Sequence, residues 1–376
     1  MILIITLISI IYVLLIGSFA YGFEKVKEFK LINLSSKTTF SVIIPFRNES
    51  KNLSKLLESI NYLEYPKNLY EIILVNDESE DDSEAIITNS LKTNDKHPNI
   101  TLINNVRISN SPKKDAITTG IKKAKNEWII TTDADCILPK YWLDSFDEFI
   151  QQTNTYCIAA PVSYLLENKL LNKFQVLDFL SLQGATIGGF GINNPFLCNG
   201  ANFAYRKDIF IEVNGFENNT NIASGDDIFL LEKIAKKYPK QVDFLKCKKA
   251  IINTTSQSSW KELLAQRIRW AAKTSSYNNW FGKLTGFIVL LMNSLIIISV
   301  ILILTSLLKT KILFLIIFIK FNIDVLLIYK SATFYNQKTV LKSFFFAFII
   351  YPFFSVYVAF ASLFKGFKWK ERTYKK

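Results

Sequence analysis

The sequence is poor in histidine and cysteine: His97 stands alone, and four cysteines occur among 376 residues. A single histidine excludes metal sites built from several imidazoles, and it leaves a Ser-His-Asp triad only if His97 serves it. No C-x-x-C pair occurs, so we interpret the cysteines as reduced and mostly buried. They are Cys136, Cys157, Cys198 and Cys247.

Phosphate-binding glycine loops are also absent. The chain contains neither G-x-G-x-x-G nor G-x-x-x-x-G-K-[ST], which argues against dinucleotide-dependent redox chemistry and P-loop hydrolysis. At 49% hydrophobic residues, the composition excludes a disordered chain. The formal net charge of +13 predicts anionic partners, either phosphate groups or an acidic membrane surface.

Long apolar runs are present at both ends of the chain. Residues 2–23 carry no charge and are long enough to span the roughly 30 Å hydrocarbon layer. Lysines follow at once, beginning with Lys25, so the positive-inside tendency places the next domain in the cytosol. A signal peptide is the alternative, because Ser18 and Ala20 resemble a cleavage site. The missing basic n-region and the length of the run favour an anchor.

The C-terminal third contains three more apolar stretches, 286–308, 312–329 and 343–364, followed by a basic tail. Three full crossings would place this tail outside, whereas its charge predicts the cytosolic side. One stretch is therefore expected to be interfacial or re-entrant. Lys320 and Asp324 interrupt the second stretch and make it the main candidate, and Pro352 makes the third another. The predicted segments are an anchor, a cytosolic domain, membrane or interfacial helices, and a basic cytosolic tail: 1–23, 24–285, 286–364 and 365–376.

In the middle of the chain, short apolar runs alternate with polar segments. Short apolar runs begin at Val42, Ile72, Thr101 and Trp128, spaced 27 to 30 residues apart, with polar helical patterns between them. This alternation predicts an α/β fold with a mostly parallel, Rossmann-like sheet covered by helices on both faces. Ligands of such sheets bind at the carboxyl ends of the strands.

Those strand ends are acidic. Asp77 follows the second run, and Asp133 and Asp135 follow the fourth. Residues two apart in an extended segment point to the same side, so Asp133 and Asp135 can face one ligand. Carboxylates without imidazoles suit Mg²⁺ or Mn²⁺, with substrate phosphates as further ligands. A D-x-D pattern also arises by chance, so its weight comes from its position after a strand.

Two further segments carry candidate chemistry. Asp226 and Asp227 precede an apolar helical pattern, where helix capping is the alternative explanation. Gln266, Arg269 and Trp270 fall at i, i+3 and i+4 on one helix face. An arginine fork beside an indole can hold a diphosphate, although an amphipathic helix that binds lipid headgroups would also be basic.

The ordered set FSVIIPFRNE, VNDESED, KKDAITTGIKKAKNEWIITTDAD, CNGANFAYRK, SGDD and QRIRW resembles the membrane-bound family 2 glycosyltransferases. The resemblance covers residues 39–270. It implies a GT-A fold with added transmembrane helices, a nucleotide-sugar donor, a Mg²⁺ or Mn²⁺ cofactor and inversion at the anomeric carbon.

The resemblance also implies roles for the acidic residues. Asp77 would recognise the nucleotide base, usually uracil, although the family more often has two aspartates where this chain has Asn76-Asp77. Asp133 would lie near the ribose and the metal, and Asp135 would bind the metal. Asp227 corresponds to the catalytic base.

The remaining roles concern the donor diphosphate and the acceptor. Gln266, Arg269 and Trp270 match Q-x-x-R-W, expected to hold the diphosphate and shape the acceptor end, and Lys114 is a weaker candidate for a nucleotide contact. The residues expected near the sugar or acceptor are Asn199, Gly200, Asn202 and Asp226.

The expected function is transfer of a sugar, from a UDP-sugar by preference, to a hydroxyl of a lipid or lipid-linked saccharide. The alternatives are a processive polysaccharide synthase, a sugar nucleotidyltransferase and a non-enzymatic membrane scaffold. Four apolar stretches are few for a polymer-conducting channel, which favours a lipid acceptor. The protein is expected in a bacterial cytoplasmic membrane with its catalytic domain in the cytosol and with no nucleic-acid partner.

Overall fold

The computed structural model describes residues 2–93, 99–220, 222, 224–273, 276–364, 367–369 and 372–374. His97, Ala223 and half of the predicted tail, 365–376, lie outside the described residues. The chain forms two compact units. The first, here called the sheet unit, comprises Lys27–Ser163 and Leu197–Thr255. The second, the helical unit, comprises Met1–Val26, Tyr164–Phe196 and Ser256–Lys376.

The sheet unit is built on a seven-stranded sheet, as far as the described residues show, with the order β3-β2-β1-β4-β8-β6-β9. Strands β3, β2, β1 and β4 run parallel, and β8 is antiparallel to both β4 and β6. The predicted mostly parallel α/β sheet is confirmed. The strands are β1 (Phe40–Phe46), β2 (Tyr70–Asn76), β3 (Ile100–Asn104), β4 (Trp128–Thr131), β6 (Cys157–Ala159), β8 (Phe203–Arg206) and β9 (Val242–Phe244).

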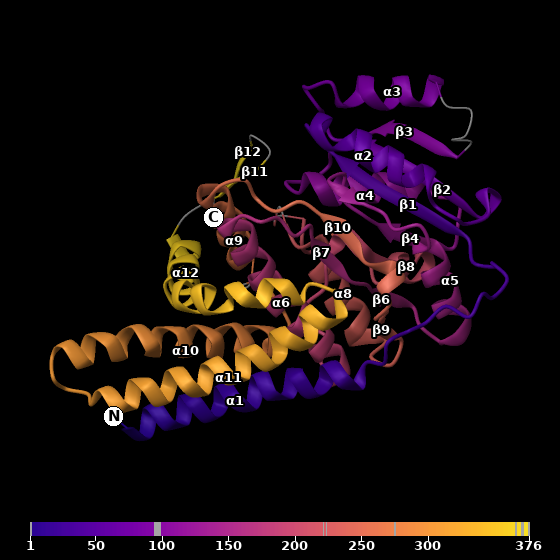
Figure 1. The fold of residues 1–376 in the computed structure, drawn as a ribbon. Coiled ribbons are helices and arrows are strands. Elements are labelled where there is room, and N and C mark those ends of the chain that lie inside the picture. Colours follow the sequence, from indigo (N-terminus) through magenta and orange to yellow (C-terminus); the bar gives the residue numbers. More distant parts are fainter. Residues whose placement is uncertain are drawn as a thin grey trace. The chain divides into compact units, whose positions relative to one another are not determined.

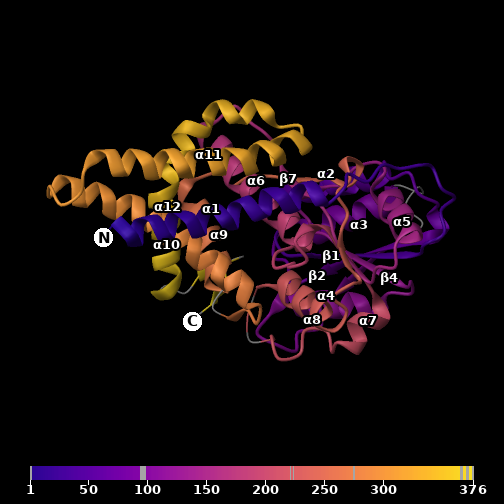
Figure 2. The ribbon, with the colours of Figure 1, turned by 90° about the horizontal axis from the view of Figure 1, so that it is seen from below.

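Helices cover both faces of this sheet, which explains why the central strands are apolar throughout. Val42, Ile43 and Ile44 in β1 are all fully buried. Figure 2 shows α2 and α5 on one face of the sheet and α4, α7 and α8 on the other. The helices of this unit are α2 (Ser50–Asn61), α3 (Ser83–Thr93), α4 (Pro112–Lys123), α5 (Trp142–Gln152), α7 (Lys207–Glu212) and α8 (Asp226–Lys237).

Short elements complete the chain. A three-stranded sheet has the order β5-β10-β7, and β11 pairs with β12. The bounds are β5 (Cys136–Ile137), β7 (Val162–Tyr164), β10 (Ile252–Thr254), β11 (Phe367–Trp369), β12 (Arg372–Tyr374), and the 3₁₀ helices η1 (Lys67–Leu69), η2 (Gly200–Asn202), η3 (Lys248–Ala250) and η5 (Lys338–Ser343).

The helical unit contains the long apolar helices (Figure 1). Among the described residues, four stretches are long and apolar enough to cross a membrane: α1, α10, α11 and residues 338–364, which include α12. The bounds are α1 (Ile2–Lys25), α6 (Leu170–Gly191), α9 (Trp260–Ala272), α10 (Trp280–Leu304), α11 (Thr310–Phe334) and α12 (Phe344–Phe364).

The charged pair in α11 does not break the helix. Lys320 is 1% exposed, and its Nζ lies 2.5 Å from Asp324 Oδ2, one turn away. The Tyr12 hydroxyl of α1 donates to the other oxygen of Asp324 at 2.6 Å. Because each charged group has a partner inside the helical unit, the pair fits within an apolar helix. An interfacial position for this stretch stays a prediction.

Helix α6 was not anticipated as a member of this unit. It packs closely against α1 through glycines. A Cβ at Gly191 would lie 1.9 Å from the Gly22 carbonyl oxygen, and one at Gly188 would lie 2.4 Å from that of Phe19. Small residues allow such close helix contacts, as in membrane helix pairs. The chain therefore enters the helical unit midway through the predicted segment 24–285 and then returns to the sheet.

Candidate active site

Three of the predicted acidic residues follow parallel strands at one edge of the sheet. Asp77 directly follows β2, and Asp133 and Asp135 follow β4; β1 lies between the two strands and is parallel to both. Adjacent strands lie about 4.8 Å apart, so the two strand ends are about 10 Å from one another across β1. The three aspartates therefore lie at the carboxyl edge of the sheet, as the sequence predicts.

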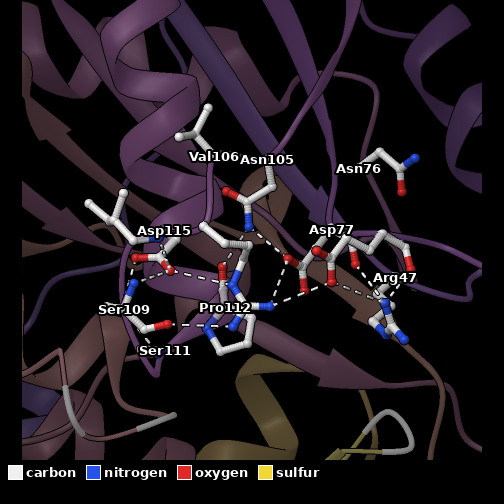
Figure 3. A network of polar contacts seen from close by, with 12 residues as sticks. Arg47, Asn76, Asp77, Asn105, Val106, Ser109, Ser111, Pro112 and Asp115 are labelled. Atoms are coloured by element: carbon white, nitrogen blue, oxygen red, sulfur yellow. Dashed lines mark hydrogen bonds and ion pairs between the residues drawn. The ribbon is translucent and has the colours of Figure 1, made fainter.

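Asp77 is held by polar side chains from neighbouring loops (Figure 3). Its carboxylate is buried, and Asn105 Nδ2 donates to Oδ1 at 2.7 Å. Arg107 Nη1 lies 3.8 Å from the same oxygen, and Arg47 donates to the Asp77 carbonyl at 3.0 Å. The contacts from Asn105 and Arg107 fix the carboxylate orientation that recognition of a base edge would need.

Asn76, which stands where relatives more often have aspartate, takes no part in holding Asp77. Its amide donates to Glu84 at 3.0 Å, and its Oδ1 accepts from the Ser79 N–H at 2.9 Å. Figure 3 shows the side chain pointing away from Asp77. The departure from the family pattern at Asn76 therefore leaves the Asp77 carboxylate in place.

A lysine that the sequence analysis did not single out joins two of the predicted aspartates. Lys113 Nζ lies 2.7 Å from Asp133 Oδ1 and 3.2 Å from Asp226 Oδ2. Burial by itself lowers the pKa of the Lys113 ammonium, but the charges of Asp133 and Asp226 outweigh it, so the pKa is raised above its ordinary value. Lys113 is therefore a permanent positive charge between these carboxylates.

The neighbouring lysine has a different environment. Lys114 is 1% exposed, and its Nζ donates to the carbonyls of Asn219 and Ile222 at 2.7 and 2.9 Å. The ammonium also lies 4.9 Å from the ring centroid of Phe229. Lys114 thus binds the backbone at Asn219 and Ile222, ahead of α8. Its contact with a nucleotide stays a prediction.

Asp227 lies beside the same cluster, in the first turn of α8. Its Oδ2 accepts from the Gly200 N–H at 3.0 Å and its Oδ1 from the Ile228 N–H at 2.8 Å. Gly225, the N-cap residue before α8, has φ +85°, a backbone conformation that favours glycine. The carboxylate of Asp227 is thus fixed by two backbone donors.

Gly200 brings these groups together. A Cβ at Gly200 would lie 2.9 Å from Asp226 Oδ2 and 3.5 Å from Lys113 Nζ, so a side chain would displace the cluster. The carbonyl of Gly200 accepts from Thr131 Oγ1 at the end of β4, at 2.9 Å. Together with the bond from the Gly200 N–H to Asp227, this bond links the end of β4, which precedes Asp133, to α8.

The two predicted asparagines beside Gly200 have structural partners. Asn199 Oδ1 accepts from the Ala201 N–H at 3.0 Å and caps η2. Asn202 is fully buried: its Oδ1 accepts from Trp142 Nε1, and its Nδ2 donates to the carbonyls of Pro161 and Ala250. Both residues therefore shape the loop that carries Gly200.

The donor set after β4 suits a hard cation. Asp133 and Asp135 are partly exposed and alternate with buried Ala134 and Cys136. Burial and the neighbouring Asp135 raise the pKa of the Cys136 thiol, and this side chain is buried, so the partly exposed donors of this segment are carboxylate oxygens. Among the described residues, no group of three or more His, Cys, Asp or Glu side chains could hold a metal. Two carboxylates fit Mg²⁺ or Mn²⁺ when phosphates supply further ligands.

The Q-x-x-R-W residues lie on α9, which belongs to the helical unit. Gln266, Arg269 and Trp270 are all partly exposed. Arg267, between them, is buried and forms an ion pair with Asp178 of α6, with Nε 2.7 Å from Oδ2. The sequence analysis did not anticipate Asp178 or the role of Arg267, because the partner lies 89 residues away.

Comparison with known families gives two overlapping matches. The family described as "Glycosyl transferase family 2" matches residues 41–213, and "Glycosyl transferase family group 2" matches residues 128–360. Among curated proteins, a poly-beta-1,6-N-acetyl-D-glucosamine synthase of Staphylococcus epidermidis is 26% identical over 277 residues. The match covers 68% of this chain and 61% of the synthase. The dolichyl-phosphate beta-glucosyltransferase ALG5C of Trichomonas vaginalis is 37% identical over 117 residues, covering 30% of this chain and 32% of that protein.

A solved structure has a similar fold over most of the chain. The mannosyltransferase PcManGT from Pyrobaculum calidifontis, in complex with GDP-Man and Mn²⁺, matches with a TM-score of 0.57 and 14% sequence identity. The similarity covers 96% of this chain and 99% of PcManGT. At this identity the comparison bears on the fold alone.

Proposed function

Because the chain belongs to glycosyl transferase family 2, we propose that it transfers a sugar from a nucleotide-diphosphate-sugar to a hydroxyl of a lipid or lipid-linked saccharide, with inversion. The observation that carries the proposal is the cluster around Lys113. There Asp133, the residue proposed to lie near the ribose and metal, shares one ammonium with Asp226. Asp227, the proposed base, adjoins the cluster through Gly200.

The donor is proposed to bind at the carboxyl edge of the sheet. Asp77 would accept an N–H of the base, and its fixed orientation supports this role. A UDP-sugar is the preferred donor because the imino N–H of uracil is a donor that a carboxylate can accept. In the helical unit, Gln266, Arg269 and Trp270 are proposed to hold the diphosphate and the acceptor end.

A divalent cation is part of the proposal. Asp135 and Asp133 would hold Mg²⁺ or Mn²⁺ together with the donor phosphates. When bound, the ion neutralises negative charge on the departing diphosphate. The structure of PcManGT was obtained with Mn²⁺, which supports a divalent ion without deciding between the two metals.

Asp227 is proposed to act as the general base. The acceptor hydroxyl must lose a proton as its oxygen attacks the anomeric carbon, and the Asp227 carboxylate would take it. Hydrogen bonds from Gly200 and Ile228 hold this carboxylate in one orientation. A diphosphate leaves as an anion, so inversion needs one base on the acceptor side and no second carboxylic acid.

The apolar helices support a lipid-linked acceptor. Four stretches long enough to cross a membrane would keep the protein in the lipid phase, where such an acceptor resides. We place the protein in a bacterial cytoplasmic membrane with the sheet unit in the cytosol, since lysines follow α1.

Processive polysaccharide synthesis is the second candidate. It is favoured by the similarity to the Staphylococcus epidermidis poly-beta-1,6-N-acetyl-D-glucosamine synthase, of which the chain spans 61%. The two candidates differ in their products. Repeated transfer would release a long polymer, whereas a single transfer would yield one discrete glycolipid.

The test uses the full chain purified in detergent and a panel of UDP-, GDP- and CDP-sugars, with membrane lipid extract as acceptor. We expect release of a nucleoside diphosphate that depends on Mg²⁺ or Mn²⁺ and on the extract, with one labelled lipid product. A ladder of long polymer would support processive synthesis instead. Release of pyrophosphate, or no turnover with any donor, would contradict the proposal.

A further inference from the structure

Arg267 occupies the position in the Q-x-x-R-W segment that directly follows Gln266, and its surroundings differ from those of a solvated arginine. The side chain is 6% exposed, and that of its partner Asp178 is 5% exposed. The contact joins α9 to α6 inside the helical unit, with Arg267 Nε 2.7 Å from Asp178 Oδ2. Burial by itself lowers the pKa of Arg267, but the Asp178 charge outweighs it and raises the pKa.

A buried ion pair of this kind is a poor source of stability. Both charges lose their hydration, and replacing such a pair by apolar residues of similar volume is often neutral or stabilising. A role in fixing one arrangement of neighbouring groups explains the pair better. Two of those neighbours belong to the motif proposed to hold the donor diphosphate.

The first neighbour is Gln266. Arg267 Nη1 donates to Gln266 Oε1 at 2.5 Å, and the Tyr164 hydroxyl lies 3.4 Å from the same oxygen. A guanidinium can only donate, so the Gln266 atom that faces it must be the carbonyl oxygen. The amino group of Gln266 is therefore on the other branch of the amide, available as a donor. Donors, rather than acceptors, suit an anionic diphosphate.

The second neighbour is Trp270. The Arg267 guanidinium carbon lies 4.3 Å from the centroid of the Trp270 ring, within the range of a cation–π contact. One buried guanidinium thus fixes the amide of Gln266 and the indole plane of Trp270 together. Asp178 fixes the guanidinium.

We propose that Arg267, anchored by Asp178, is a positioning residue that turns the Gln266 amino group toward the donor diphosphate and sets the plane of the Trp270 indole. This inference rests on the proposed function, because the diphosphate role of Gln266 belongs to it. Arg267 itself does not need to touch the donor.

The test separates positioning from folding with the double variant Arg267→Met/Asp178→Leu. Either single variant leaves a buried charge without its partner and is expected to lose stability, whereas the double variant is expected to regain most of it. Positioning predicts that the double variant still binds UDP at least tenfold more weakly in titration calorimetry. Its donor KM should rise by a similar factor, with a smaller change in kcat.

Gln266→Glu provides a second test that keeps Arg267 in place. The new carboxylate can pair with Arg267, so the fold is retained, but the amino donor is replaced by an acceptor oxygen. We expect this variant to lose UDP affinity at least as strongly as the double variant. The matched control is Arg206→Met/Asp208→Leu, which removes an exposed pair of the same residue types and should leave UDP affinity unchanged.

The outcomes distinguish this inference from the proposed function. If the wild-type chain binds no nucleoside diphosphate in the panel UDP, GDP and CDP, the proposed function fails. If the wild type binds UDP and Arg267→Met/Asp178→Leu binds it equally well, the proposed function survives and the positioning role of Arg267 is wrong. If Gln266→Glu binds UDP equally well, the diphosphate contact proposed for Gln266 is wrong, and the positioning role of Arg267 fails with it.

Discussion

Removing the ammonium of Lys113 should destabilise the acidic cluster in a way that a divalent cation reverses. In Lys113→Met, Asp133 and Asp226 lose the positive charge that lies 2.7 and 3.2 Å from their oxygens. Loss of one partner of a buried ion pair costs about 3 to 5 kcal/mol. The side chains of Lys113 and Asp133 are 19% and 35% exposed, so solvent screens the pair and we expect a smaller cost, about 1 to 2 kcal/mol.

The assay is thermal unfolding of the detergent-purified protein with and without Mn²⁺ and UDP. A ligand at a hundred times its Kd adds about 2.7 kcal/mol to the native state. This gain should be larger in Lys113→Met than in the wild type, because Lys113 no longer competes for Asp133. The matched control is Lys114→Met, whose ammonium binds backbone carbonyls. It should lose stability, but its gain from Mn²⁺ and UDP should equal that of the wild type. Equal Mn²⁺ gains in Lys113→Met and the wild type would refute the reasoning.

Three further predictions concern the metal, the pH dependence and helix packing. Asp135→Ala should weaken UDP binding only when Mn²⁺ is present, as calorimetry with and without the metal would show; equal loss in both conditions would reject the metal role. Burial raises the pKa of Asp144 to about 6, so its contribution to stability is present below pH 4 and is lost as the pH rises through 6. Asp144→Asn should therefore raise the unfolding free energy by about 1 kcal/mol at pH 8, discounted for its partly exposed position, and change it little at pH 4. Gly191→Leu should separate α1 from α6 and lower the unfolding temperature, whereas Gly17→Leu, with one contact at 3.9 Å, should change it little.

The sequence carried enough information to predict the sheet and its acidic edge. Strand spacing near 30 residues and fully apolar runs are local properties, and a parallel βαβ unit places the ends of its strands at one edge. Asp77, Asp133 and Asp135 therefore follow the strands that the pattern assigned to them. The long apolar helices are equally local, because twenty consecutive apolar residues are visible without tertiary structure.

The choice between Lys113 and Lys114 could not be made from the sequence. Adjacent residues on a helix point about 100° apart, and here Lys113 and Lys114 bind different partners. Which one reaches the carboxylates depends on where Asp226 and Asn219 lie, more than 100 residues later in the chain. The sequence shows only that two lysines follow Pro112 at the start of a helix. This pattern does not indicate which of the two binds the aspartates.

The sequence also did not predict that segments of the two units alternate along the chain, because this too depends on contacts between distant residues. Helix α6 has mixed polarity along its length and no apolar window long enough to cross a membrane, so its sequence resembles that of a helix in a soluble domain. Its membership in the helical unit depends on backbone contact between Gly188 and Phe19, which only the folded chain shows. Likewise, the Arg267–Asp178 pair joins α9 to α6 across 89 residues.

The central claim, that one carboxylate beside the Lys113 cluster acts as the base of a sugar transfer, is tested most directly by Asp227→Asn. Asp208→Asn is its matched control, since each aspartate lies in the first turn of its helix and accepts from the next residue's N–H at 2.8 Å. We predict that Asp227→Asn binds UDP like the wild type but transfers sugar at least about a hundredfold more slowly, while Asp208→Asn retains activity. Near-normal transfer by Asp227→Asn would contradict the account.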